Sequence, residues 1–297
     1  MSDLFIQKSK NKNKTISKKY KSKTKDKKLL QKELKNQIVQ QKQSENSLQL
    51  FDQIIFQPFK QEYYDETIDL LTDVFVNQEP ICKSTNISFG DLRQFVEQVV
   101  KIGANLSSIA IQKYKDQEGN ICNKVISAII SCDQADLNMY EQQIASSKVP
   151  QIQFILNLFQ ITEIKLNELL GINLGNIKKG QIIHQVLLGT HKNFQGMGVG
   201  FYLSLHNAQI VKQHGFQNAV MELTSSLSLK ICKLLNIGKI IYSVKYTEIR
   251  EDDKFREGFQ QIEDRLLDEQ ISIYFIDTSD FVINNYEQYI KSLKFIF

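Results

Sequence analysis

The sequence lacks the features that mark membrane-spanning and zinc-binding proteins. It has no apolar run of about 18 residues, the least that a transmembrane helix needs, so no membrane span is expected. Its four cysteines, at positions 82, 122, 132 and 232, show no Cys-x-x-Cys spacing and form no Cys/His cluster. We therefore predict no metal site and expect reduced, mostly buried thiols in an intracellular protein.

Arginine is absent from residues 1–47, although 14 lysines occur there beside four acidic residues. This segment carries a net charge of +10, and the remaining 23 basic and 29 acidic residues give −6. The lack of arginine argues against a mitochondrial presequence, and no apolar region follows the charges as in a secretory signal. Too few apolar residues occur here to offset the entropy of ordering, so residues 1–47 are expected to be disordered.

The role of this lysine-rich tail stays open between three interpretations. It is a solvated, solubilising segment, a contact for an import receptor, or a weak contact for nucleic acid. The corresponding location is the cytoplasm, with the nucleus as the alternative. The folded domain is expected to cover residues 48–297.

Hydrophobic periodicity predicts an α/β domain in this folded part. Apolar residues at helical spacing recur in five segments, whereas seven short apolar segments bounded by polar turns read as strands. The helices are predicted at 62–76, 89–102, 151–170, 199–214 and 226–235. The strands are predicted at 51–59, 106–114, 121–132, 182–191, 216–223, 239–249 and 271–277. This order favours a mixed sheet with helices on both faces. Helix 151–170 either packs on the body or walls a substrate pocket.

A glycine-rich turn, Asn193-Phe194-Gln195-Gly196-Met197-Gly198-Val199-Gly200, joins strand 182–191 to helix 199–214. Free backbone N–H groups and the positive end of the helix dipole make such a turn an anion site, suited to a pyrophosphate. A plain structural turn is the simpler alternative. The spacing does not fit a dinucleotide-binding fingerprint, and the Gly-Lys-Ser/Thr of a Walker loop is missing.

The pattern Gln195-x-x-Gly198-x-Gly200 matches the Gln/Arg-x-x-Gly-x-Gly/Ala signature of the GNAT acetyltransferases. The order of elements from Phe51 to Ile276 also resembles that superfamily, which implies a GNAT fold with a mixed, mostly antiparallel central sheet. The resemblance implies acetyl-coenzyme A as co-substrate. Backbone groups of Leu188, Gly189 and Thr190 would pair with its pantetheine arm. Its pyrophosphate would lie on Gln195, Gly196, Met197, Gly198, Val199, Gly200 and Phe201.

Three further features resemble the arylalkylamine N-acetyltransferase-like branch, which includes the insect dopamine acetyltransferases. These are the segment Val74–Pro80 at the end of the first helix, the helical insertion at 151–170, and the serine-rich turn and helix 224–234. The resemblance implies that Glu79 is the general base and that Thr224 and Ser228 are the assisting hydroxyls.

The sequence departs from the branch at several of these positions. Thr224 stands where serine is usual, and Asn236-Ile237-Gly238 replaces the common Gly-Phe. Cys232 replaces the tyrosine acid of many GNAT enzymes and is expected to be a core residue. His184 lies where vertebrate arylalkylamine enzymes begin a pair of histidines, but the second position is Val186. His184 is therefore interpreted as a strand histidine, with half of a proton relay as the alternative.

The resemblance predicts an N-acetyltransferase in which a primary amine attacks the thioester directly. A small aryl- or alkylamine is the first choice of acceptor, and the acidic body favours a cationic one. A lysine or N-terminal acetyltransferase and a non-catalytic coenzyme A-binding module are the alternatives. Backbone N–H groups of the cofactor strand would stabilise the oxyanion.

Overall fold

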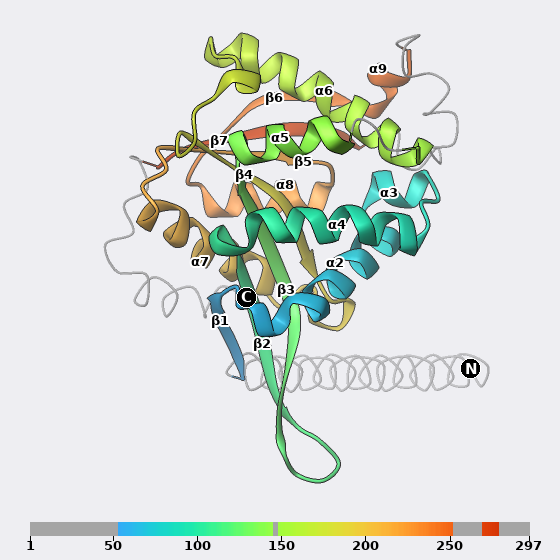
Figure 1. Ribbon diagram of the computed structural model, residues 1–297, viewed down its shortest axis with the longest axis vertical. Coiled ribbons are helices and arrows are strands. Elements are labelled where there is room, and N and C mark those ends of the chain that lie inside the picture. Colours follow the sequence, from blue (N-terminus) through green and yellow to red (C-terminus); the bar gives the residue numbers. More distant parts are fainter. Residues whose placement is uncertain (1–52, 145–147, 252–268, 279–297) are drawn as a thin grey trace, which may run out of the picture. The chain divides into compact units, whose positions relative to one another are not determined.

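The computed structural model describes residues 53–144, 148–251 and 269–278 (Figure 1). From Ile54 onward the described residues belong to one compact unit. The lysine-rich tail at 1–47 lies outside the described residues.

A seven-stranded sheet runs through this unit in the order β1-β2-β3-β4-β5-β7-β6. The strands are β1 (Ile54–Pro58), β2 (Ser108–Lys115), β3 (Ile121–Asp133), β4 (Ile182–Thr190), β5 (Asn218–Leu223), β6 (Lys239–Lys245) and β7 (Gln270–Asp277). Only β4 and β5 pair in parallel, and all other neighbours are antiparallel. The predicted mixed, mostly antiparallel sheet is confirmed.

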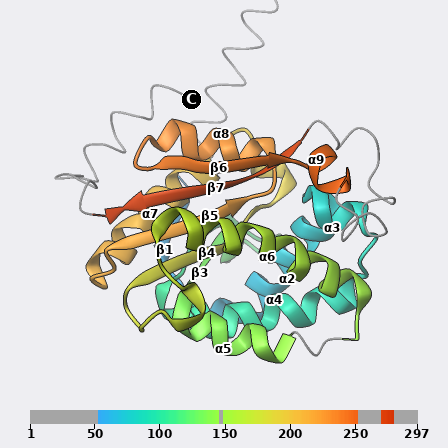
Figure 2. The same cartoon turned by 90° about the horizontal axis from the view of Figure 1, so that it is seen from above.

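Helices cover both faces of the sheet, as predicted. The helices are α2 (Tyr64–Gln78), α3 (Pro80–Ser84), α4 (Phe89–Gly103), α5 (Gln134–Ile144), α6 (Pro150–Leu170), α7 (Val199–Gln213), α8 (Ser226–Leu235) and α9 (Tyr246–Glu251). Figure 2 shows α4, α5 and α6 on one side of the sheet and α7 and α8 on the other. Among the described helices, none is both long and apolar enough to cross a membrane.

The stripes that predicted α2 and α4 form the core between these helices and the sheet. On α2, Ile68 and Leu71 are fully buried, and on α4, Val96, Val99 and Val100 are fully buried. Burying one such side chain contributes about 1.5–3 kcal/mol. The same stripe that fixes each helix therefore also fixes how it packs against β3 and β4.

Strands β4 and β5 are paired over only three residues before they part. Their ladder runs from Ile182↔Asn218 to His184↔Val220, although β4 continues to Thr190 and β5 to Leu223. On its other side β4 carries a bulge, since Ile130 pairs with Leu187 and Ser131 with Gln185. Val186 is therefore an extra residue outside the β3–β4 ladder. The parting strands open a gap in the middle of the sheet.

One predicted strand ends earlier than expected, and two short helices had no counterpart in the predictions. The strand predicted at 239–249 ends at Lys245, and the chain continues as α9. Tyr246 begins this helix, is 1% exposed in the core, and donates a hydrogen bond from its hydroxyl to the Thr224 carbonyl (3.0 Å). The predicted strand therefore ends before Tyr246, because this side chain is buried in the core and bonded to a residue 22 positions away. The short helices α3 and α5 were not predicted.

Candidate functional site

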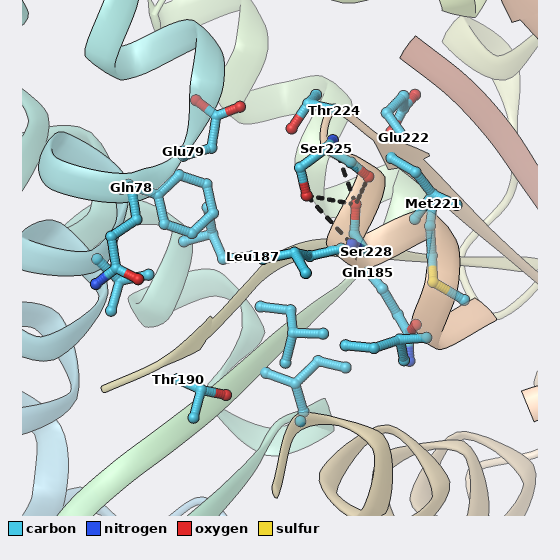
Figure 3. Close-up of a pocket in the computed structure, with 18 of the residues that line it drawn as sticks. Gln78, Glu79, Gln185, Leu187, Thr190, Met221, Glu222, Thr224, Ser225 and Ser228 are labelled. Carbon is cyan, nitrogen blue, oxygen red and sulfur yellow. Dashed lines mark hydrogen bonds between the residues drawn. The ribbon is translucent and has the colours of Figure 1, made fainter. Parts of the chain in front are cut away.

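A cavity of about 400 Å³ occupies the gap between β4 and β5 (Figure 3). Its walls come from segments far apart in the sequence: the ends of α2 and α3, α4, α6, β4, the glycine-rich turn, β5 and α8. The three predicted catalytic residues, Glu79, Thr224 and Ser228, all line it. The glycine-rich turn lines the same cavity, so the fold brings together the two groups of residues that the sequence singled out.

Backbone geometry explains the glycines of the turn. Gly196 and Gly198 have φ angles of 76° and 79°, in the left-handed region that side chains other than glycine rarely adopt. Gly198 is the residue directly before α7, so the free N–H groups of the first helical turn begin there. At Gly200 a Cβ would come within 3.3 Å of the Thr190 hydroxyl and 3.4 Å of Ile231. The turn is therefore shaped to receive an anion at the start of α7.

Eight of the ten predicted cofactor residues line the cavity, and Gly189 and Met197 do not. The lining residues are Leu188, Thr190, Gln195, Gly196, Gly198, Val199, Gly200 and Phe201. The place of Gly189 has a packing cause, because a Cβ there would lie 2.9 Å from the Leu71 side chain of α2. Glycine at this position lets α2 approach β4 closely.

Gln195 fastens the turn to the rest of the site. Its side-chain nitrogen donates one hydrogen bond to the Thr190 carbonyl (3.0 Å) and another to the side-chain oxygen of Gln78. Gln78 is the last residue of α2 and directly precedes Glu79. The signature glutamine thus links the glycine-rich turn to the segment that carries the predicted base.

Glu79 lies where two helices meet. It ends α2 in an extended conformation and caps α3, with Pro80 at the first helical position. Its Oε2 accepts a hydrogen bond from the Cys82 N–H (2.6 Å), whereas Oε1 is buried and has no partner with hydrogen-bond geometry. Burial raises the pKa of Glu79, and the nearby Cys82 N–H and Thr224 hydroxyl oppose this rise because they stabilise the carboxylate.

The two predicted hydroxyls differ in how much of their hydrogen-bonding capacity is used. Ser228 forms a capping box with Ser225 at the start of α8: its hydroxyl donates to the Ser225 carbonyl (2.8 Å) and faces the Ser225 N–H (3.4 Å). Thr224 instead faces Glu79 across the cavity. Sequence reasoning missed Ser225, which lines the cavity beside them.

No protein-family model and no curated protein matches the sequence. Solved structures do match: arylalkylamine N-acetyltransferase 2 from Aedes aegypti, with a TM-score of 0.58 and 18% identity, covers 76% of this chain and 99% of its own. Polyamine N-acetyltransferase from Drosophila melanogaster has a TM-score of 0.56 and 16% identity, over 75% of this chain and 99% of its own. An agmatine N-acetyltransferase gives 0.57 and 15%, with coverage of 75% and 99%.

This chain has the GNAT fold. At these identities the likeness concerns the architecture. In this GNAT domain the insertion helix α6 both packs on the sheet and walls the cavity, through Ile152, Ile155, Leu156 and Phe159. The packing predicted for residues 151–170 is therefore confirmed, and that the cavity they wall is a substrate pocket stays a prediction.

A buried polar pair, His184 and Glu222, joins β4 to β5 at the base of the gap in the GNAT domain. Their contact links His184 Nε2 and Glu222 Oε2, with side chains 14% and 8% exposed. The other ring nitrogen, Nδ1, lies 2.9 Å from Gln134 Oε1. Glu222 lines the cavity and was missed from sequence, although it lies on β5 only two residues before Thr224.

The hydrogen-bond chain behind His184 fixes where its protons lie. The Leu174 carbonyl can only accept, so Asn138 donates to it (2.5 Å), and Gln134 in turn donates to Asn138 Oδ1 (2.7 Å). Gln134 therefore presents its oxygen to His184, and His184 Nδ1 carries a hydrogen. One proton must then lie between His184 Nε2 and the facing oxygen of Glu222. His184 is thus a strand histidine that also bonds across the gap to Glu222.

Cys232 is a core residue at the cavity wall of the GNAT domain. It is 3% exposed, and burial raises its pKa to about 12. Its thiol is therefore protonated at neutral pH and is no thiolate nucleophile. Cys82 and Cys132 are also buried, whereas Cys122 is partly exposed; all four cysteines are free, as the sequence predicted.

Proposed function

We propose that the chain is an acetyl-coenzyme A-dependent N-acetyltransferase that acts on small aryl- or alkylamines. One observation carries this proposal: a single cavity joins an anion-binding helix start to a partly buried carboxylate with a raised pKa. Acetyl transfer to an amine needs both groups, a holder for the charged end of the donor and a base for the protonated acceptor.

The donor would bind along the parted edge of β4. Its pyrophosphate would accept hydrogen bonds from the free N–H groups at Gly198–Gly200, where the helix dipole also favours negative charge. The pantetheine arm would run past Thr190 and Leu188 toward the base of the gap. Backbone N–H groups of β4 beyond His184, where the strand no longer pairs with β5, would stabilise the tetrahedral oxyanion.

The acceptor would bind on the side of β4 that faces α2, α4 and α6. Aromatic rings from these three helices, those of Phe75, Phe95 and Phe159, line the cavity there. Aromatic and aliphatic walls suit an aryl or alkyl group, while Glu79 suits the ammonium. Enclosure by α6 favours a small molecule over a protein side chain. The named activities of the similar structures, on agmatine, arylalkylamines and polyamines, support this acceptor class.

The chemical steps follow from the placement of Glu79 and Thr224. Glu79 takes a proton from the bound ammonium, and the free amine attacks the thioester carbonyl directly. The nitrogen of the tetrahedral intermediate still carries one proton more than the amide product needs. As the intermediate expels the thiolate of coenzyme A, this proton would pass to a hydroxyl group, which gives its own proton to the thiolate. Thr224 is the better donor of that proton than Ser228, because the Ser228 hydroxyl is held in the cap of α8.

The test is an acetyl-coenzyme A assay with a panel of small amines and basic peptides. Release of free thiol gives the rate, and mass spectrometry of the acceptor identifies the N-acetyl product. We expect turnover with aryl- or alkylamines. Turnover on peptides alone would replace the proposal by a protein acetyltransferase, and binding of acetyl-coenzyme A without turnover would leave a coenzyme A-binding module.

A further inference from the structure

A buried amide network fixes the orientation of Gln185 in β4. Asn207 of α7 is fully buried and donates from Nδ2 to the Leu106 carbonyl (2.8 Å), which can only accept. Asn207 Oδ1 therefore points the other way, where it accepts from the Ser131 hydroxyl (2.7 Å) and from Gln185 Nε2 (2.7 Å). The side-chain nitrogen of Gln185 is thus directed at α7.

The remaining atom of this amide, Gln185 Oε1, is buried and has no hydrogen-bond partner among the described residues. Gln185 is 9% exposed and lines the cavity, near Met221 (Figure 3). A buried amide oxygen without a partner is unfavourable by about 1–3 kcal/mol, and the network prevents the amide from turning over to relieve it. Gln185 therefore brings a fixed acceptor, in need of an N–H or O–H donor, to the wall of the cavity.

The position of Gln185 selects which ligand reaches it. Its amide contacts α7, whereas Glu79 and the aromatic walls of the acceptor pocket belong to α2, α4 and α6. Gln185 also lies three residues before Leu188 on β4, about 10 Å deeper in the gap at 3.3 Å per residue. A chain that lies along β4 from the start of α7 would bring its far end to this point.

We propose that Gln185 Oε1 accepts a hydrogen bond from the pantetheine amide nearest the thioester of the acyl donor. The inference rests on the proposed function and adds a recognition residue to it. Coenzyme A carries a secondary amide in that part of its arm, and its N–H needs a partner once it leaves water. Gln185 is a positioning residue, because it holds the arm and touches no reacting atom.

The test measures coupling between this side chain and that N–H by calorimetry. Gln185→Met keeps the length of the side chain and removes the amide. The ligands are coenzyme A and an analogue in which an ester replaces the amide nearest the thiol. We expect Gln185→Met to weaken coenzyme A binding by about 5- to 100-fold, because the N–H is left buried without a partner. The ester analogue should bind wild type and Gln185→Met about equally.

Ser131→Ala is the matched control, since it removes the other donor to Asn207 Oδ1 and leaves Gln185 in place. It should keep the wild-type ratio of affinities for the two ligands. Equal weakening of both ligands by Gln185→Met, or the same ratio change in Ser131→Ala, would show a loss of packing and overturn the inference. If Gln185→Met bound coenzyme A as tightly as wild type does, the inference would be overturned, but the proposed function would stand. Failure of wild type to bind coenzyme A overturns both.

Discussion

Replacing Glu79 with glutamine should remove base catalysis and little else. The cap of α3 needs only an oxygen to accept from the Cys82 N–H, and the glutamine amide still supplies one. The other position, held by the unpartnered Oε1, becomes an NH₂ group that cannot take a proton. General base catalysis contributes about 10²–10⁴-fold, so turnover should fall by roughly that factor, or by about 3–5 kcal/mol in barrier height.

The pH dependence separates loss of a base from loss of structure. Burial raises the pKa of Glu79. As the pH falls, wild-type turnover should therefore begin to decline at a higher pH than the ordinary pKa of a glutamate would predict. Glu79→Gln should lack this acidic limb. Its affinity for coenzyme A should hardly change, because the anion-binding turn is a separate part of the cavity.

Stability should change in the opposite direction from activity. Between the usual and the raised pKa, folded Glu79 holds a proton that the unfolded chain has lost. Wild-type stability therefore falls as pH rises through this window and stays lower above it. Glu79→Gln should unfold at a higher temperature than wild type near neutral pH, with the difference shrinking in acid.

The assay is thiol release at saturating amine across a pH series, with thermal unfolding beside it. Glu163→Gln is the matched control: burial also raises the pKa of Glu163, but this carboxyl does not line the cavity. It should turn over nearly as wild type does. If Glu79→Gln kept normal turnover and the same acidic limb, Glu79 would not be the base, and the His184–Glu222 pair would be the next candidate.

Other predictions concern the turn, the sheet and the tail. Gly198→Asp should abolish acetyl-coenzyme A binding in calorimetry, because it adds charge at the anion site; Gly119→Asp, which has the same left-handed strain in a distant hairpin, should bind normally. Gly238→Ala should lower the free energy of unfolding by about 1–3 kcal/mol in urea, since its Cβ would lie 2.4 Å from the Phe275 carbonyl. Removal of residues 1–46 should leave turnover on a small amine unchanged, as the lining residues described fall between 74 and 234; a large drop would implicate the tail in the active site.

Long periodic segments were predictable because their own side chains determine them. The apolar stripes of α2, α4 and α6 appear at helical spacing in the sequence, and these helices begin and end within about two residues of their predicted limits. The five-residue helix α3 is shorter than two turns, so no stripe could show it. Its cap by Glu79 and its start at Pro80 were the available signals.

The glycine-rich turn was predictable from sequence for a different reason. The left-handed backbone at Gly196 and Gly198 is accessible to few residues besides glycine, so the conformation leaves a mark in the sequence. The order of strand, turn and helix around it was equally local. These features, with the resemblance of the Glu79-Pro80 segment, were sufficient to name the candidate site.

The contacts across the gap between β4 and β5 could not be predicted, because no local pattern in the sequence indicates them. The hydrogen-bond partners of three strand residues come from helices tens of residues away: α5 for His184, α7 for Gln185 and α6 for Glu222. A strand pattern in the sequence gives only the face on which each side chain lies. The sequence by itself determined the long helices and the glycine-rich turn, because periodic burial and local backbone sterics fix them, and the candidate base came from the resemblance of its segment to a known family. Only the tertiary structure decided which buried polar atoms are paired and which face the cavity, because that depends on partners distant in the chain.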